Sequence, residues 1–94
     1  MISYHDITVN RRNRLTLDRI FTRPTLADIT WNEFERLMKA LGATKHEGKG
    51  SRVRFVLPNQ RILNIHQPHP KLVLKKYMVE DVRELLAEEG LGPE

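Results

Sequence analysis

The sequence predicts a small α+β domain of the order α-β-β-β-α, in which a three-stranded antiparallel sheet carries both helices on one face. Three observations lead to this prediction. Apolar residues recur at helical spacing over residues 31–41 and again over 77–86, and the stretch between them, residues 43–66, is strand-like. Two turn signals, Gly48-Lys49-Gly50 and Pro58-Asn59-Gln60, divide that stretch into three strands. Because the helices cover one face of the sheet, the other face is left open.

Residues 1–29 are expected to be an N-terminal arm, and residues 30–92 the domain itself. A short basic run, Arg11-Arg12-Asn13-Arg14, is more typical of a solvated tail than of a nucleic-acid contact. It precedes a helical turn that must stop before Arg23-Pro24, since the residue before a proline avoids the helical region. We expect this arm to pack loosely or to become ordered on a partner.

The first helix of the domain begins at Thr30. Thr30 and Glu33 form a predicted capping box, in which each side chain accepts a hydrogen bond from the other residue's backbone N–H. Gly42 supplies the stop at the other end. The aromatic residues of this helix share its apolar stripe, so they are assigned to the core and not to base stacking; the stripe is Trp31, Phe34, Leu37, Met38 and Leu41.

The strands follow directly. Residues 43–47 form a short first strand, and the next two strands pair across a three-residue loop in a register chosen by the hydrophobic pattern, because a slip of one residue would mix the two faces. The predicted pairs are Leu57–Arg61, Phe55–Leu63, Val53–Ile65, Arg54–Asn64 and Arg52–His66. The open face then carries Arg52, Arg54, Val56, Ile62, Asn64 and His66, and the apolar Val56–Ile62 pair beside the cations suggests a protein partner.

After the third strand, His66-Gln67-Pro68-His69-Pro70 is expected to be extended, because each residue before a proline resists helix. The second helix begins near Tyr77 or Met78 and ends at Gly90. Glu80 and Asp81 lie near its start, where negative charge complements the helix dipole.

Charge is distributed unevenly along the chain, whose net charge is +4. Residues 43–76 carry eight lysines and arginines against one glutamate, whereas residues 77–94 carry one arginine against six acidic residues. Such a basic middle suits a phosphate-bearing polyanion, although a merely solvated surface would look the same. There is no cysteine, no apolar run long enough to cross a bilayer and no secretory signal after Met1, so we expect a cytoplasmic protein with no membrane partner.

The arrangement resembles the HicA toxin family of bacterial toxin–antitoxin systems, small proteins with a double-stranded-RNA-binding-domain-like fold. The resemblance runs over residues 31–91 and rests on order and spacing, not on one specific motif. Its markers are the helix 31–41, Leu41-Gly42-Ala43 before the first strand, Gly50-Ser51 opening the second strand, His66-Gln67-Pro68-His69-Pro70 after the third, and Lys75, Tyr77, Val79, residues 82–86 and Leu91. It implies an RNA-cleaving toxin, an mRNA interferase, that a HicB-type antitoxin neutralises by covering the active face.

One departure from the family pattern concerns catalysis. The pattern has a catalytic histidine directly after Gly-Ser, where this chain has Arg52, and an arginine stays protonated and cannot act as a base. The predicted register places His66 opposite that position. We therefore expect His66 to be the base that activates the 2′-hydroxyl of RNA and Arg52 to stabilise the phosphate, with His69 a possible acid.

Other residues are assigned to RNA binding: Lys49, Ser51, Arg54, Lys75 and Lys76. No metal or other cofactor is expected, because His66 and His69 have a proline between them and no cysteine or nearby carboxylate to complete a ligand set. Three alternatives stay open at this point. His66 could simply be held by a backbone carbonyl, the domain could be a catalytically inactive RNA-binding module, or it could bind only proteins.

Overall fold

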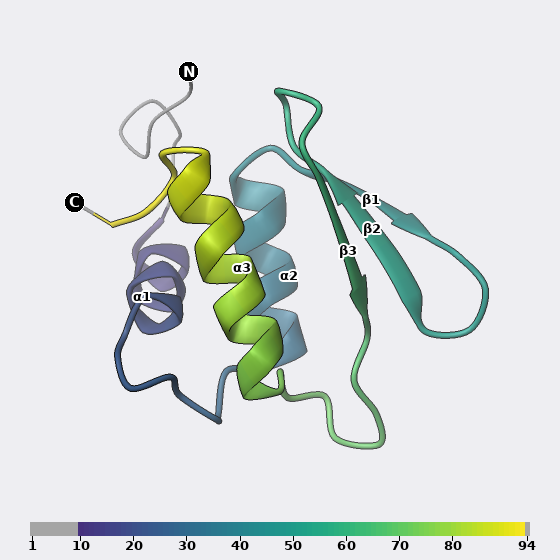
Figure 1. Ribbon diagram of the computed structural model, residues 1–94, viewed down its shortest axis with the longest axis horizontal. Helices are drawn as coiled ribbons and strands as arrows, with labels where there is room; N and C mark the ends of the chain where they lie inside the picture. The colour runs from purple at the N-terminus through teal and green to yellow at the C-terminus, as the bar shows by residue number, and fades with distance from the viewer. Residues whose placement is uncertain (1–9, 94) are drawn as a thin grey trace.

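The computed structural model of the chain describes residues 10–93. Its elements are α1 (Arg11–Ile20), α2 (Trp31–Ala40), β1 (Thr44–Glu47), β2 (Arg52–Val56), β3 (Ile62–His66) and α3 (Lys76–Glu88) (Figure 1). The strands form one antiparallel sheet of order β1-β2-β3. The predicted order α-β-β-β-α is confirmed from α2 onward, and α1 is an additional helix. Within the described residues, no helix has both the length and the apolar character needed to cross a bilayer.

Local signals in the sequence set both ends of α2. The predicted capping box is present: the Thr30 hydroxyl accepts a hydrogen bond from Glu33 N–H at 3.1 Å, and the Glu33 carboxylate accepts one from Thr30 N–H at 2.9 Å. At the other end Gly42 has a φ of +88°, and the N–H of Ala43 reaches back to the carbonyl of Met38 at 3.0 Å. This left-handed turn ends the helix and directs the chain into β1.

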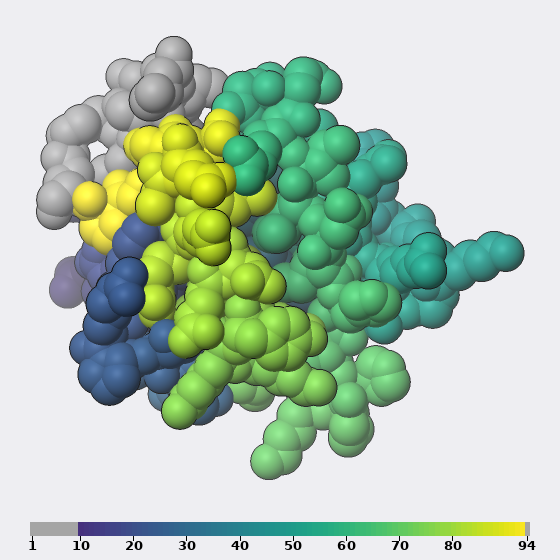
Figure 2. All heavy atoms as spheres, in the orientation of Figure 1, coloured from purple at the N-terminus to yellow at the C-terminus, as the bar shows by residue number. Residues whose placement is uncertain are grey.

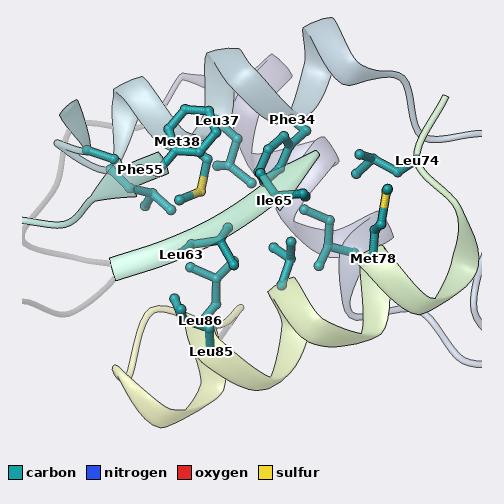
Figure 3. Close-up of a cluster of buried hydrophobic side chains, with 14 of the residues drawn as sticks. Phe34, Leu37, Met38, Phe55, Leu63, Ile65, Leu74, Met78, Leu85 and Leu86 are labelled. Carbon is teal, nitrogen blue, oxygen red and sulfur yellow. The ribbon is translucent and has the colours of Figure 1, made fainter. Parts of the chain in front are cut away.

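The core lies between the helices and the inner face of the sheet. Figure 3 shows Leu63 and Ile65 of β3 between two rows of side chains, one from α2 that includes Phe34 and Met38, and one from α3. Phe55 of β2 packs edge-on against Phe34, with ring centroids 5.3 Å apart. All of these side chains are buried, so the helices hold the inner face of the sheet out of water and leave the outer face free.

The predicted strand register is confirmed. In the structure Arg52 lies opposite His66, and the remaining β2–β3 pairs follow it along the hairpin. Leu57 N–H donates to the Arg61 carbonyl at 2.8 Å, which closes the predicted three-residue loop. Gln60 completes this loop with a φ of 74°, as the last residue of such a loop commonly does.

The expectation that the N-terminal segment packs loosely is wrong for residues 10–29, while residues 1–9 lie outside the described part of the chain. Helix α1 lies on the side of α2 and α3 away from the sheet (Figure 1). Leu17 and Ile20 have no exposed surface, because the helix turns its narrow apolar stripe inward and leaves its arginines on the outer side. Ile29, in the segment after the helix, is equally buried. The basic run is therefore the solvent-facing start of a packed helix.

Two connections bind this N-terminal segment to the domain. The backbone around Ile29 pairs with the segment before α3, where Leu74 N–H donates to the Ile29 carbonyl at 2.8 Å. Arg83 of α3 is only 7% exposed and donates to the carbonyls of Ile20 and Thr22 at 2.9 and 3.1 Å. The guanidinium thus contacts carbonyls at and just beyond the carboxyl end of α1. This end of a helix carries partial negative charge and therefore favours a cation.

Candidate functional site

The outer face of the sheet carries the candidate functional side chains. Because successive residues of a strand point to opposite faces, the buried residues of β2 and β3 alternate with exposed ones. We call the outward set the open face: His46, Arg52, Arg54, Val56, Ile62, Asn64 and His66. All are exposed except Val56, which is half-buried. In the space-filling view the β1–β2 region forms the right-hand surface of the molecule, away from α1 (Figure 2).

Two rows of the open face matter for chemistry. In one, His46 of β1 lies opposite Arg54 of β2, which lies opposite Asn64 of β3. In the next, Arg52 lies opposite His66. Directly opposed residues have Cβ atoms only about 4.5–5.5 Å apart, so each imidazole has a guanidinium-bearing neighbour across the strand pair.

These rows border a hollow of about 600 Å³, a volume within the range of small-molecule sites. Its lining comes from all three strands: His46, Glu47, Gly48, Arg52, Val53, Arg54, Asn64, Ile65 and His66. The hollow is thus a property of the whole sheet and not of the β2–β3 hairpin alone.

The cations of the hollow are uncompensated within the described residues. Arg19, Lys45 and Arg61, elsewhere in the fold, all pair with carboxylates, whereas Arg52 and Arg54 have no carboxylate partner in residues 10–93. Among the described lining residues Glu47 is the one acidic side chain, and its carboxylate lies 3.3 Å from Lys45 Nζ. The hollow therefore presents net positive charge, which attracts phosphate.

His66 makes a side-chain contact with Ser51. The Ser51 Oγ lies 3.3 Å from Nδ1 of His66, and Gln67 N–H donates to the Ser51 carbonyl at 2.8 Å, which extends the strand pairing by one step. A hydrogen bond at Nδ1 orients the ring and leaves Nε2 without a partner among the described residues. Nε2 is therefore the nitrogen available for proton exchange.

The remaining predicted site residues lie outside this hollow. Lys49 is exposed in the β1–β2 turn, and Lys75 and Lys76 are exposed at the start of α3. Figure 1 shows that α3 begins at the end of the molecule where β3 stops. His69 borders a second, smaller hollow of about 310 Å³ together with Ser51. The structure therefore brings Arg52, Arg54 and His66 together and leaves the lysines and His69 around them.

His46 is the residue that the sequence reasoning missed. Its signal was the alternation of side chains in β1, which directs His46 to the open face. In the structure Glu47 lies opposite Val53 and His46 opposite Arg54. The turn holds this register through a hydrogen bond from Gly48 N–H to the Arg52 carbonyl at 2.9 Å. Within residues 10–93 no three His, Cys, Asp or Glu side chains come together in a way that could hold a metal ion.

Together these features define a small α-β-β-β-α domain with a cationic, imidazole-bearing sheet face. The family model described as HicA toxin of bacterial toxin-antitoxin matches residues 31–88, well over half of the chain, and the chain belongs to this family of toxins. Helix α1 lies outside the matched residues. Searches of curated proteins and of solved structures gave no match.

Proposed function

We propose that this toxin acts by cutting RNA, as an endoribonuclease that uses no metal ion. The observation that carries the proposal is the direct opposition of Arg52 and His66 at the edge of a positively charged hollow. The family pattern expects an imidazole at the position of Arg52. The imidazole of His66 lies directly across the strand pair from that position, and this supports the proposal that the pair supplies a base and a phosphate-binding cation together.

The chemistry follows from these two side chains. Nε2 of His66 takes the proton of a ribose 2′-hydroxyl, and the 2′-oxygen attacks the adjacent phosphorus. The Arg52 guanidinium donates to the non-bridging oxygens and stabilises the charge that develops on them. As the bond from phosphorus to the 5′-oxygen breaks, that oxygen takes up a proton. The products are a 2′,3′-cyclic phosphate and a 5′-hydroxyl end.

RNA binding beyond the scissile phosphate is assigned to cations around the hollow. Arg54 lies in the next row of the sheet, and Lys49 is exposed in the β1–β2 turn, outside the hollow. Ser51 contributes its hydroxyl, and Lys75 and Lys76 extend the basic surface toward α3. Such contacts position a backbone and carry no sequence information. With mRNA as substrate, the protein would act in the cytoplasm.

A HicB-type antitoxin is the proposed protein partner. Ile62 is 45% exposed and lies opposite Val56, so an apolar strip adjoins the cationic rows on the same face. A partner with an apolar ridge and acidic rim would cover both parts at once and exclude RNA.

One observation favours a second candidate, a catalytically inactive RNA-binding module. Arg52 stands where the family pattern has its base, and the contact of His66 with Ser51 is one that a purely structural histidine could also make. In that case Arg52 and Arg54 grip the RNA backbone and no bond is broken.

Incubating the purified protein with mixed RNA in the presence of EDTA separates the two candidates. The wild type should cleave, His66→Ala should lower the rate by about 100-fold or more, and Arg52→Ala by a similar factor. His69→Ala, outside the hollow, is the matched control and should remain within a few-fold of wild type. Binding without cleavage by the wild type would establish the inactive module. Equal cleavage by all variants would point to a contaminating nuclease and refute the assignment.

A further inference from the structure

Among the described residues, two imidazoles line the hollow on the open face. His46 of β1 and His66 of β3 both line it, and Arg52 and Arg54 of β2 lie on the strand between them. Two imidazoles therefore flank, across the three strands, a pair of guanidinium groups that have no carboxylate partner within residues 10–93. The carboxylate of Glu47, which also lines the hollow, lies 3.3 Å from Lys45 Nζ.

This order matches the geometry of an in-line displacement. The attacking 2′-oxygen and the leaving 5′-oxygen lie on opposite sides of the phosphorus, so the base and the acid must approach from opposite sides. Adjacent strands lie about 4.8 Å apart, which places the two outer strands roughly 10 Å apart with the middle strand between them. A phosphate held by arginines of β2 is thus approached from one side by β1 and from the other by β3.

We propose that His46 is the general acid of the reaction, an inference that rests on the proposed RNA cleavage. The His46 imidazolium donates its proton to the 5′-oxygen as the phosphorus–oxygen bond breaks, while His66 accepts the proton of the attacking 2′-hydroxyl. His66 gains one proton and His46 loses one in each turnover. Proton exchange with solvent then returns both rings to their starting states.

His69, the acid suggested by the sequence, fits this role less well. It borders the smaller hollow beside Ser51, in the segment that continues directly from β3. It therefore lies past the end of β3, beside the residues that lead into β2, and not in the hollow that His46 and His66 line. Of the three histidines that residues 10–93 contain, His46 and His66 are the two that share a hollow.

The test compares two RNA substrates that differ in one leaving atom. In the first the scissile bond leads to a normal 5′-oxygen, and in the second to a 5′-sulfur, which departs as a thiolate and needs no proton. His46→Gln should cleave the oxygen substrate about 100-fold or more slowly than wild type. It should cleave the sulfur substrate within several-fold of the wild-type rate. His66→Gln should be slow on both substrates, because the 2′-hydroxyl still needs a base.

Two controls separate chemistry from folding and binding. His46 is exposed, so His46→Gln should leave thermal unfolding and RNA affinity close to wild type. His69→Gln should cleave both substrates within a few-fold of wild type.

Each other outcome is informative. If His46→Gln cleaves the oxygen substrate at the wild-type rate, His46 is not the acid, and the proposed ribonuclease still stands. If His46→Gln is slowed equally on both substrates, the same two conclusions follow. If the wild-type protein cleaves neither substrate, the proposed ribonuclease is wrong and this inference fails with it.

Discussion

Replacing Arg83 with methionine is expected to loosen α1 and the loop after it from the rest of the fold. The Arg83 side chain makes three hydrogen bonds to that segment, to the carbonyls of Ile20 and Thr22 and, at 2.9 Å, to the Thr25 hydroxyl. The partners are about 60 residues away in sequence, so no local interaction replaces them.

The size of the effect can be estimated from burial. A net hydrogen bond from a charged donor contributes about 1.5–3 kcal/mol, but three bonds made by one side chain are not additive. Methionine also removes the cost of burying a charge, which offsets part of the loss. We expect Arg83→Met to lower the free energy of unfolding by about 3 kcal/mol, with a fall in Tm of roughly 15 °C.

Arg61→Met provides a matched control, because Arg61 also contacts α3 but does so at the surface. Its side chain is 44% exposed and pairs with Glu88 and Glu89 at 2.6 and 3.3 Å. Exposed ion pairs contribute less than about 1 kcal/mol. Urea unfolding measures both variants, and amide exchange shows whether the protection of α1 falls selectively in Arg83→Met. If Arg83→Met is no less stable than Arg61→Met and α1 stays protected, the reasoning about buried anchoring is refuted.

Three further predictions concern single positions. Gly42→Ala should destabilise the fold by about 1–3 kcal/mol in thermal unfolding, because φ is +88° there and a Cβ would lie 2.9 Å from Pro58 Cγ; an unchanged Tm would contradict this. Gln60→Gly should stabilise by about 0.5–1 kcal/mol in urea, since it relieves a φ of 74°, and a loss of stability would show that the Gln60 side chain matters more than its backbone. The hydrogen bond to Glu35, with Nζ at 2.7 Å, raises the pKa of Lys45 above its usual 10.5. The stability that Lys45 contributes is therefore complete below pH 10.5 and lost as the pH rises through the raised pKa. Lys45→Met should cost about 1 kcal/mol at pH 7 and progressively less as the pH rises above 10.5, and a cost that stays constant over that range would exclude the ion pair as its source.

Much of the site was predictable because its information is local. A loop of three residues and the alternation of side chains are sufficient to place Arg52 opposite His66, and the structure has that pair. The same procedure applied across Gly48-Lys49-Gly50 would have placed His46 on the open face but opposite Arg52. In the structure Gly48 N–H donates to the Arg52 carbonyl, so the loop is residues 49–51 and His46 lies opposite Arg54. His46 was missed because buried and exposed residues do not alternate clearly in β1. An inward position of this strand is occupied by a charged residue, Lys45, which forms an ion pair with Glu35 of α2.

The sequence by itself determined the order of elements from α2 to α3, the capping of α2 and the register of the β2–β3 hairpin, because each depends on residues a few positions apart. Only the tertiary structure decided that α1 belongs to the core. Its apolar stripe is narrow and lies among arginines, so the helix gains stability from burial against α2 and α3 and from Arg83, 63 residues away from Ile20. The contact of Ser51 with His66 and the union of both imidazoles in one hollow were likewise decided by how the strands come together, since side-chain contacts across a sheet depend on its twist and packing.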